Sequence, residues 1–243
     1  MDTIKTNFGK RKVSLNLKTA LVQNVFSDVA KNYDLMNDLM SFGTHRLWKK
    51  EFIEYINIQK DDQIIDVGSG TGDLINLVLK EKKNNIIYST DLNNEMLNYG
   101  RKKFKNKKVN FINANAEKLP FESHTFDKYI ISFCMRNVTN MNIALTEAYR
   151  VLKPGGIFYC MEFSKPNNYV IDKIYKQYKK KFIPWIGEKV ANNKRAYIYL
   201  EESIDLFPNQ NEFLKNIKRI GFKKSKYIDM FNGIIAIHSG FKI

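Results

Sequence analysis

The chain has 243 residues, of which 44% are hydrophobic and 13% aromatic, which predicts one large globular domain and excludes a disordered protein. No apolar run approaches the roughly 20 residues that span a bilayer, so no membrane-spanning helix is expected. A net charge of +15 favours anionic surfaces such as acidic lipids or nucleic acid, although a general lysine and asparagine bias also explains it. Cys134 and Cys160 lack C-x-x-C spacing, so neither a disulfide framework nor a metal site is expected.

Residues 1–20 are polar and basic, and we expect a flexible arm there, ahead of a single domain formed by residues 21–243. Met1–Lys12 has no apolar core and does not resemble a secretory signal. Asp2 and a single arginine also make it a poor mitochondrial transit peptide. A cytoplasmic location in a bacterium is therefore expected in preference to the mitochondrial matrix.

Between Leu21 and Lys50, apolar residues recur at helical spacing and are interrupted at Ser41–Gly43, which predicts two amphipathic helices. Packing explains most of these residues, and the histidines of the chain are interpreted as structural. Several polar side chains in these helices exceed what packing needs. We expect them to belong to a helical cap over a ligand-binding mouth: Tyr33, Asp34, Asn37, His45 and Arg46.

The stretch Ile64–Asp73 reads I-I-D-V-G-S-G-T-G-D and predicts a strand, a tight glycine turn and a helix N-terminus. This is how α/β folds bind nucleotide-like ligands, with glycine providing positive φ and close approach. The G-x-G-x-G spacing differs from the dinucleotide pattern. A carboxylate at Asp66 would repel a pyrophosphate but suits a cationic ligand such as S-adenosylmethionine. Glycines that serve packing alone are the alternative.

The β-branched run Asn85–Asp91 ends in an acid about 20 residues beyond the glycine turn, where nucleotide-binding folds place a ribose-binding carboxylate. Asp91 can accept hydrogen bonds from both ribose hydroxyls, and capping of the next helix is a compatible second role. A third strand at Val109–Ile112 leads into a polar loop. There, the Asn115 side chain and the backbone N–H near Ala116 can contact adenine.

A fourth strand at Thr125–Ser132 places Arg136 and Asn137 at the carboxyl end of a central strand, where α/β enzymes collect ligand-binding groups. A helix at Asn140–Leu152, stopped by K-P-G-G, and a fifth strand at Ile157–Phe163 continue the alternation. The pattern predicts a parallel sheet with helices on both faces.

Residues 164–207 break this alternation and predict a helical lid in which aromatic residues and lysines are interleaved. The lid is interpreted either as a roof over an apolar substrate, with a basic rim that touches a bilayer, or as a nucleic-acid surface. A last helix at Gln210–Ile220 precedes a closing antiparallel hairpin of Phe222–Met230 and Gly233–Lys242.

Together these features resemble a class I S-adenosylmethionine methyltransferase, through the glycine stretch, Asp91, N-A-N-A-E-K-L-P-F, I-S-F-C-M-R-N-V and Y-R-V-L-K-P-G-G. Longer motifs are similar to those of the ubiquinone/menaquinone biosynthesis C-methyltransferase (UbiE) family: V-F-S-D-V-A-K-N-Y-D-L-M-N-D-L-M-S-F-G-T-H-R-L-W-K, R-N-V-T, M-E-F-S-K-P and G-I-I-A-I-H-S-G-F-K. The resemblance runs from about Leu21 to the C-terminus. V-G-S-G-T-G stands where many members have a Gly-Gly pair, which leaves the turn feasible.

The resemblance implies a Rossmann-like α/β sheet of seven strands with the last antiparallel, an N-terminal helical cap and a lid inserted between strands five and six. It implies S-adenosylmethionine as cofactor and C-methylation of a polyprenylated quinol ring in ubiquinone or menaquinone biosynthesis. Peripheral contact with the inner membrane face is expected, nucleic acid is not, and a homodimer or a quinone-biosynthesis complex is compatible. The cofactor residues expected from the turn and from the resemblance are Asp66, Gly68, Gly70, Thr71, Asp91, Asn115, Ala116 and Ser132.

Carbon methylation requires a ring made nucleophilic by loss of a hydroxyl proton. Arg136 is the expected partner of the phenolate because it is permanently cationic and lies at a strand end, a choice that the resemblance also indicates. Asn137 is expected to orient a hydroxyl. Asp73, acting through a water, and Tyr33 are candidate bases, and a phenol deprotonated before binding requires none.

Alternatives are left open at this point. Arg136 could instead form a structural ion pair with Asp34 or Glu162. The chain could methylate nucleic acid or another small molecule, although S-F-C-M-R-N stands where an N-P-P-Y-type motif would follow strand four. It could also be a non-catalytic member of a quinone-biosynthetic assembly, which no residue favours.

Overall fold

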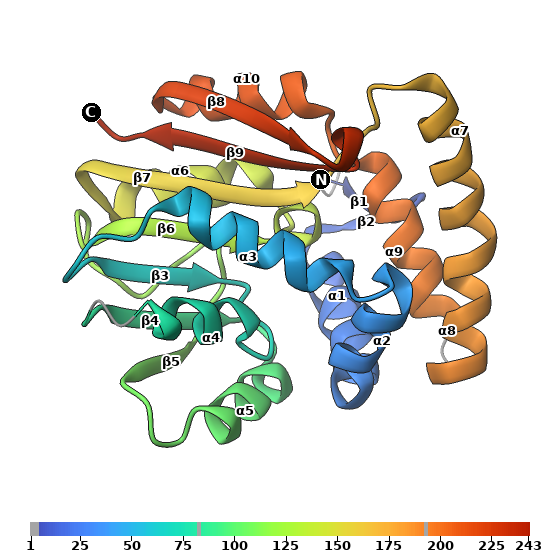
Figure 1. The fold of residues 1–243 in the computed structure, drawn as a ribbon, viewed down its shortest axis with the longest axis horizontal. Coiled ribbons are helices and arrows are strands. Elements are labelled where there is room, and N and C mark those ends of the chain that lie inside the picture. The colour runs from blue at the N-terminus through green and yellow to red at the C-terminus, as the bar shows by residue number, and fades with distance from the viewer. Residues whose placement is uncertain (1–4, 82–83, 192–193) are drawn as a thin grey trace.

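The computed structural model describes residues 5–81, 84–191 and 194–243, and its centre is a seven-stranded sheet (Figure 1). The strand order is β5-β4-β3-β6-β7-β9-β8, in which β9 runs antiparallel to both neighbours and the other pairs are parallel. The strands are β3 (Gln63–Val67), β4 (Ile86–Asp91), β5 (Val109–Asn113), β6 (Phe126–Ser132), β7 (Leu152–Phe163), β8 (Lys223–Met230) and β9 (Ile235–Phe241). The predicted sheet and its closing hairpin are confirmed.

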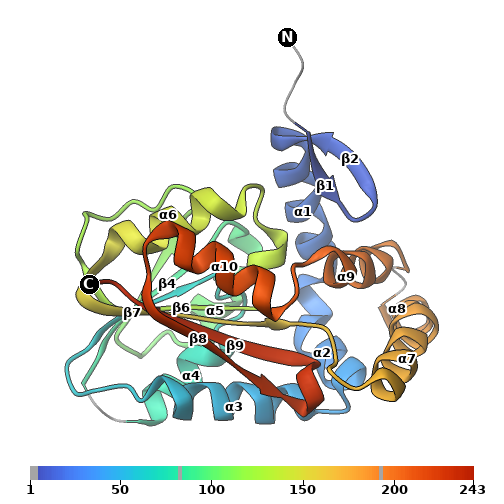
Figure 2. The same ribbon diagram turned by 90° about the horizontal axis from the view of Figure 1, so that it is seen from above.

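Helices cover both faces of this sheet, as Figure 2 shows. On one face, α3 and α4 bury Phe52 and Ile75 against Ile64, while on the other α6 and α10 bury Leu145 and Phe213. These five side chains are completely buried because apolar residues line both faces of a sheet covered by helices. The flanking helices are α3 (Thr44–Ile56), α4 (Asp73–Lys80), α5 (Asn94–Lys103), α6 (Met141–Val151) and α10 (Gln210–Ile220).

Local signals explain where several helices begin. The Asn209 side chain accepts a hydrogen bond from the Glu212 backbone N, and the Glu212 carboxylate accepts one from the Asn209 backbone N, a capping box that starts α10. At α5 the cap is Asn93, whose side chain accepts from Met96 N at 3.0 Å. The second role predicted for Asp91, a helix cap, is therefore wrong, because the asparagine two residues later occupies that position.

The K-P-G-G sequence lies inside the long strand β7 and does not precede a separate one. β7 pairs with β6 at Leu152 and again from Ile157, with an irregularity in the register between. Gly155 has φ 83°, a conformation that glycine adopts without a Cβ penalty. The predicted break is therefore a bulge within the strand.

The expectation of a flexible arm over residues 1–20 is wrong for its described part, residues 5–20. β1 (Lys5–Phe8) and β2 (Arg11–Ser14) form an antiparallel hairpin that leads directly into α1 (Leu15–Val29). The hairpin is stabilised from outside: the Phe8 ring stacks on Tyr199 at 4.4 Å between centroids, and Lys10 N donates to Glu202 at 3.1 Å. These partners lie on α9, about 190 positions away, where no local pattern could reveal them.

The predicted cap and lid are both helical and pack on each other beside the sheet (Figures 1 and 2). Met36 from the cap is buried in one cluster with Ile183, Ile186 and Tyr197 from the lid. The cap consists of α1, η1 (Ala30–Asn32) and α2 (Tyr33–Ser41). The lid consists of α7 (Tyr169–Gln177), the π-helical turn η3 (Tyr178–Phe182), α8 (Ile183–Ala191) and α9 (Lys194–Leu206).

Candidate functional site

Three adjoining cavities lie at the carboxyl ends of β3, β4 and β6, the edge where open α/β sheets bind ligands. The strand-end cavity, of about 820 Å³, is bordered by Gly70, Asp91, Asn115, Ala116 and Ser132. The glycine-loop cavity, of about 370 Å³, is bordered by Lys49, Asp66, Thr71 and Asp73. The apolar cavity, of about 1060 Å³, lies between cap and lid and is bordered by Val29, Met36, Arg136, Tyr175 and Tyr197. Tyr33 and Phe133 border all three, so this is where contents of the cavities would meet.

The glycine turn forms the wall between the first two cavities. Gly68, Gly70 and Gly72 all have positive φ, at 66°, 56° and 84°. A Cβ at Gly68 would lie 2.2 Å from Sγ of Cys134, so the turn packs directly on the segment after β6. A Cβ at Gly70 would meet no atom of the described chain within 4 Å, which leaves room for a ligand to approach the backbone.

Asp91 is held at the end of β4 by the backbone of both neighbouring loops. Its Oδ2 accepts a hydrogen bond from Gly70 N at 2.9 Å, and its Oδ1 accepts from Asn93 N at 2.8 Å. Burial raises the pKa of Asp91, and these N–H donors oppose the shift. A carboxylate has about four acceptor sites, and Asp91 borders the strand-end cavity, so it can accept hydrogen bonds from two vicinal hydroxyls of a ligand there.

Asp66 lies at the floor of the glycine-loop cavity and is 3% exposed. Burial and the neighbouring Asp91 raise its pKa to about 7. In the described part of the chain its Oδ2 has no hydrogen-bond partner. A buried acceptor without a partner is costly, so this oxygen is suited to a donor supplied by a ligand, such as an ammonium group.

The remaining predicted cofactor residues divide between the two polar cavities. Asn115, Ala116 and Ser132 border the strand-end cavity, and Ser132 also borders the glycine-loop cavity. The Asn115 side chain accepts from Glu117 N, which fixes the loop. Of the two polar cavities, Thr71 borders the glycine-loop cavity alone. Its hydroxyl donates to Asp34 at 2.9 Å, which joins the turn to the cap.

Asp73 is clamped between two lysines. Its Oδ2 lies 2.7 Å from Nζ of Lys49 and its Oδ1 lies 3.0 Å from Nζ of Lys103. Burial alone would raise the pKa of Asp73, but the two ammonium groups outweigh it and hold the pKa well below the usual range. A carboxylate this strongly stabilised is a weak base, so the structure disfavours the predicted role of Asp73 in proton removal.

Arg136 forms the predicted alternative contact, an ion pair with Glu162. Its Nη1 lies 2.9 Å from Oε2 of Glu162 and donates to the Phe133 carbonyl at 2.6 Å. Among the described residues, Nε has no hydrogen-bond partner, and no bond is formed by Nη2. Arg136 is therefore fixed through one nitrogen while it borders the apolar cavity, with other N–H donors remaining for a ligand.

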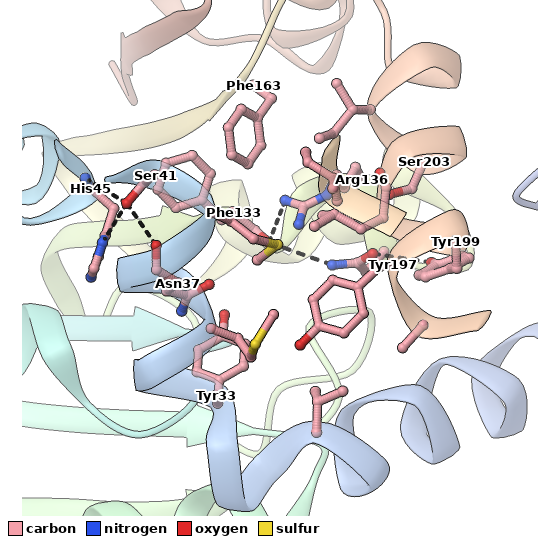
Figure 3. Close-up of a pocket in the computed structure, with 18 of the residues that line it drawn as sticks. Tyr33, Asn37, Ser41, His45, Phe133, Arg136, Phe163, Tyr197, Tyr199 and Ser203 are labelled. Carbon is pink, nitrogen blue, oxygen red and sulfur yellow. Dashed lines mark hydrogen bonds between the residues drawn. The ribbon is translucent and has the colours of Figure 1, made fainter. Parts of the chain in front are cut away.

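The polar groups of the apolar cavity come from cap, lid and sheet. Figure 3 shows Asn37, Ser41 and His45 on one side and Arg136 and Tyr197 on the other. Together they leave the cavity apolar with a few fixed polar groups, as small-molecule sites commonly are.

Tyr33, His45 and Asn137 also border the apolar cavity, and their protonation states or hydrogen bonds follow from their surroundings. Burial raises the pKa of Tyr33 to about 12, so its hydroxyl is a donor at neutral pH and not a base. Burial and Lys49 lower the pKa of His45, which keeps the imidazole neutral. Asn137 accepts from the Tyr199 hydroxyl at 3.0 Å and borders both the strand-end and the apolar cavity.

Sequence reasoning missed several residues of the site, most importantly Lys49, Phe133 and Asn93. Lys49 stands on the buried face of α3 beside Trp48 and is 9% exposed. A charged residue at a core position of an amphipathic helix is unusual, and this signal could have identified it. No sequence pattern could have identified Phe133, because its place in the site depends only on the three-dimensional position at which the three cavities meet. Within the described residues, no cluster of His, Cys, Asp and Glu could hold a metal ion.

Comparisons with known proteins agree with this geometry. A model of the ubiE/COQ5 methyltransferase family matches residues 14–242. The ubiquinone/menaquinone biosynthesis C-methyltransferases UbiE of Rickettsia typhi and Rickettsia prowazekii are 51% and 50% identical to the chain. Each alignment covers 98% of this chain and 99% of the relative.

Solved structures show the same fold at low sequence identity. A methyltransferase of Thermotoga maritima, described as S-adenosylmethionine-dependent, superposes with a TM-score of 0.68 at 18% identity, over 91% of this chain and 100% of that one. A second, from Methanococcus maripaludis, gives 0.59 at 19% identity over 98% and 95%. The predictions of the fold and of an S-adenosylmethionine-dependent C-methyltransferase are confirmed. Matched along almost its entire length, the chain belongs to the ubiE/COQ5 methyltransferase family.

Proposed function

We propose that this protein transfers a methyl group from S-adenosylmethionine to a ring carbon of a polyprenylated quinol in ubiquinone or menaquinone biosynthesis. The observation that carries the proposal is the meeting of two polar cavities with a large apolar one at Tyr33 and Phe133. The reaction and the pathway are those named for the relatives at about 50% identity.

The polar cavities fit the cofactor. Asp91 would accept the ribose hydroxyls, and the loop at Asn115 and Ala116 would contact adenine. Gly70 would leave room for the amino-acid end, whose ammonium group would satisfy the unpartnered Oδ2 of Asp66. When bound, S-adenosylmethionine supplies an electrophilic methyl group. Thr71 and Ser132 complete this binding set from the turn and from the end of β6.

The apolar cavity would hold the quinol ring with one oxygen toward Arg136. Loss of the hydroxyl proton to water would push electron density to a ring carbon, which would take the methyl group while the bond from that methyl to sulfur breaks and S-adenosylhomocysteine is left. The proton on the same carbon would then pass to water, which restores the aromatic ring. Arg136, oriented by Glu162, offers N–H donors to the phenolate. Asn137 and the Tyr33 hydroxyl position the ring as hydrogen-bonding groups.

The hydroxyl proton then goes to water and not to a carboxylate base of this chain, while Arg136 stabilises the phenolate that remains. The low pKa of Asp73 and the high pKa of Tyr33 disfavour both as bases at neutral pH. A guanidinium next to the hydroxyl lowers the pKa of a phenol, so the ring can reach the transfer position as a phenolate.

The proposed substrate carries a long apolar tail, and a peripheral contact with the inner face of the membrane is part of the proposal. In the described residues, no helix is both long enough and apolar enough to cross a bilayer. The tail would leave the ring-binding end through the apolar side of the cavity, which Val29, Met36 and Ile183 border.

Two experiments test the proposed function. The purified chain, given S-adenosylmethionine and a short-tailed demethylated quinol, should yield a ring-methylated product by mass spectrometry. The gene should also restore growth to a bacterium that lacks the quinone C-methyltransferase, and the demethylated precursor should disappear from quinone extracts. Persistence of the precursor in cells that express the protein well, with no product in the purified assay, would overturn the substrate assignment.

A further inference from the structure

The outermost helices of the lid carry apolar side chains on the face directed away from the protein. α7, η3 and α8 form the edge of the molecule farthest from the sheet (Figure 1). Four large side chains on them are exposed: Tyr169 at 79%, Val170 at 61%, Ile174 at 65% and Trp185 at 55%. Val170 and Ile174 are four residues apart, so they lie on the same side of α7.

An aromatic side chain from the cap extends this face. Phe42, in the turn between α2 and α3, is 74% exposed and its ring lies 5.6 Å from that of Phe182. Phe182 in turn lies 5.9 Å from Trp185. The combined surface of Phe42, the apolar residues of α7 and Trp185, called here the outer lid face, therefore comes from two segments about 140 positions apart in the chain.

Lysines surround the outer lid face. Residues 169–189 contain six lysines and two carboxylates. Lys176 pairs with Asp172 at 2.5 Å, and Lys179 pairs with Asp205. Lys173, Lys180 and Lys181 are exposed, and no carboxylate in the described ranges lies within ion-pair distance of them. The helices that carry the apolar residues thus also carry three lysines without a carboxylate partner, in a segment with an excess of positive charge.

We propose that the outer lid face docks on the headgroup region of an anionic lipid bilayer, an inference that rests on the proposed function because a lipid-tailed quinol is found there. An amphipathic helix with aromatic and aliphatic residues on one side and lysines beside them binds in the plane of such an interface. Tryptophan and tyrosine prefer this depth, and each lysine near an anionic surface adds to the attraction.

The charge and the apolar side chains of the outer lid face favour a bilayer over a second copy of the chain and over nucleic acid. A symmetric pair of copies would bring the same unpaired lysines face to face, since an isologous interface uses one patch twice. Nucleic acid would match the lysines and could stack on Trp185, but it would leave the exposed aliphatic side chains of Val170 and Ile174 without an apolar partner. Lipid headgroups match the lysines, and the region just beneath them accepts the aliphatic and aromatic side chains.

Docking in this orientation places the apolar cavity one helix away from the lipid. Tyr175, Tyr178 and Ile183 border that cavity from the inner side of the same helices. The Tyr178 hydroxyl donates to the Met40 carbonyl, which joins the lid to the cap near Phe42. The lid is therefore both the wall of the substrate cavity and the membrane contact.

The protein contains a natural probe for this contact. It has two tryptophans, of which Trp48 is 8% exposed and Trp185 is 55% exposed. Vesicles of phosphatidylcholine with phosphatidylglycerol should shift the emission of the full-length chain to shorter wavelength, and neutral phosphatidylcholine vesicles should not. The shift should vanish in Trp185→Phe while that variant still sediments with the anionic vesicles.

Matched variants test the charge and the apolar residues separately. Lys173→Gln/Lys180→Gln/Lys181→Gln should weaken partitioning on the order of a hundredfold, at about 1 kcal/mol for each lysine near the surface. Ile174→Ser/Trp185→Ser should also release the protein from vesicles. The controls change exposed residues on other faces and should bind like wild type: Lys105→Gln/Lys107→Gln/Lys108→Gln and Tyr99→Ser/Ile143→Ser.

The outcomes separate this proposal from the proposed function. All lid-face variants should keep wild-type turnover of a short-tailed quinol that needs no bilayer. Absence of vesicle binding, or equal loss in the control variants, overturns the docking face. An emission shift that appears on raising the protein concentration without lipid would indicate that a second copy covers this face. A shift on adding RNA would indicate nucleic acid. Either result overturns the bilayer as the occupant. Vesicle binding without any turnover refutes only the proposed function.

Discussion

The side chains of Arg136 and Glu162 form an ion pair in which Nη1 lies 2.9 Å from Oε2, and only 6% and 1% of the two side chains are exposed. Glu162 also accepts from the backbone N of Arg136 and of Phe163. The pair joins the end of β7 to the segment after β6 and fixes the guanidinium beside the apolar cavity.

Glu162→Gln keeps the shape of this carboxylate but leaves the guanidinium buried without a counter-charge. We expect a loss of unfolding free energy of about 3–5 kcal/mol, as for other buried pairs with one partner removed. Urea denaturation measures it. As a control, Glu54→Gln breaks a pair that is exposed on both sides and should change stability by at most about 1 kcal/mol. Equal effects of the two changes would contradict this account.

Asp73→Asn tests the base directly. Because Lys49 and Lys103 already keep Asp73 ionised, we expect the pH profile of kcat to have the same acidic limb in the variant as in wild type. Lys49 loses its buried partner, so thermal stability should fall. If the acidic limb disappears in Asp73→Asn, the carboxylate takes the proton after all.

Asp91→Asn retains the shape but removes the charge that strengthens the hydrogen bonds to the ribose. Hydrogen bonds to charged groups contribute about 1.5–3 kcal/mol each, so the Kd for S-adenosylmethionine should rise about tenfold to a hundredfold or more. Calorimetry measures the affinity and thermal unfolding the stability. Since Gly70 N and Asn93 N also bond to Asp91, some stability is lost as well. Unchanged affinity in a destabilised variant would refute the ribose contact.

Gly68→Ala and Gly155→Ala separate steric contact from backbone conformation. Both glycines have positive φ, which costs an alanine about 1–2 kcal/mol. At Gly155 nothing lies within 4 Å of the new Cβ, whereas at Gly68 the Cβ would lie 2.2 Å from the Cys134 sulfur. We therefore expect Gly68→Ala to be markedly more destabilising by urea denaturation and to abolish cofactor binding. Similar losses in both variants would show that the contact relaxes freely.

His238 predicts a dependence of stability on pH. Burial lowers its pKa from 6.5 to about 4 in the folded state, so between these values the unfolded chain binds the additional proton. Stability should fall by up to about 3 kcal/mol as pH drops from 6.5 to 4, at 1.36 kcal/mol per unit of pKa shift. His238→Gln should flatten this part of the stability profile. As a control, His124→Asn changes an exposed histidine and should leave the slope of unfolding free energy against pH as in wild type. If His238→Gln keeps the wild-type slope, His238 is not its source.

The sequence predicted the sheet well because its signals are local. β-branched runs, the glycine turn at Gly68 and Gly70 and the helix starts at Asn140 and Asn209 each act within a few residues. The residues at the carboxyl ends of β3, β4 and β6 followed from the topology alone, which is why Asp91 was found.

Long-range relationships could not be predicted from these signals. The role expected for Asp73 changed, and Arg136 gained an ion-pair partner, because Lys49, Lys103 and Glu162 approach them from elements distant in the chain. Protonation depends on such neighbours and on burial, which a sequence pattern does not contain. The residue types at the strand ends could be read from the sequence, but the partners that determine their chemistry could not.

The contact between the hairpin and α9 sets an order of events during synthesis. The backbone N of Lys10 donates to Glu202, which lies 192 positions later in the chain. The ring of Phe8 likewise cannot stack before Tyr199 has been synthesised. At about 5–20 residues translated per second, the first strands spend roughly 10–40 s outside the ribosome before their binding surface exists. The leading segment thus cannot complete its contacts until α9 has been synthesised, and nascent chains that stop short of α9 leave it open to proteases.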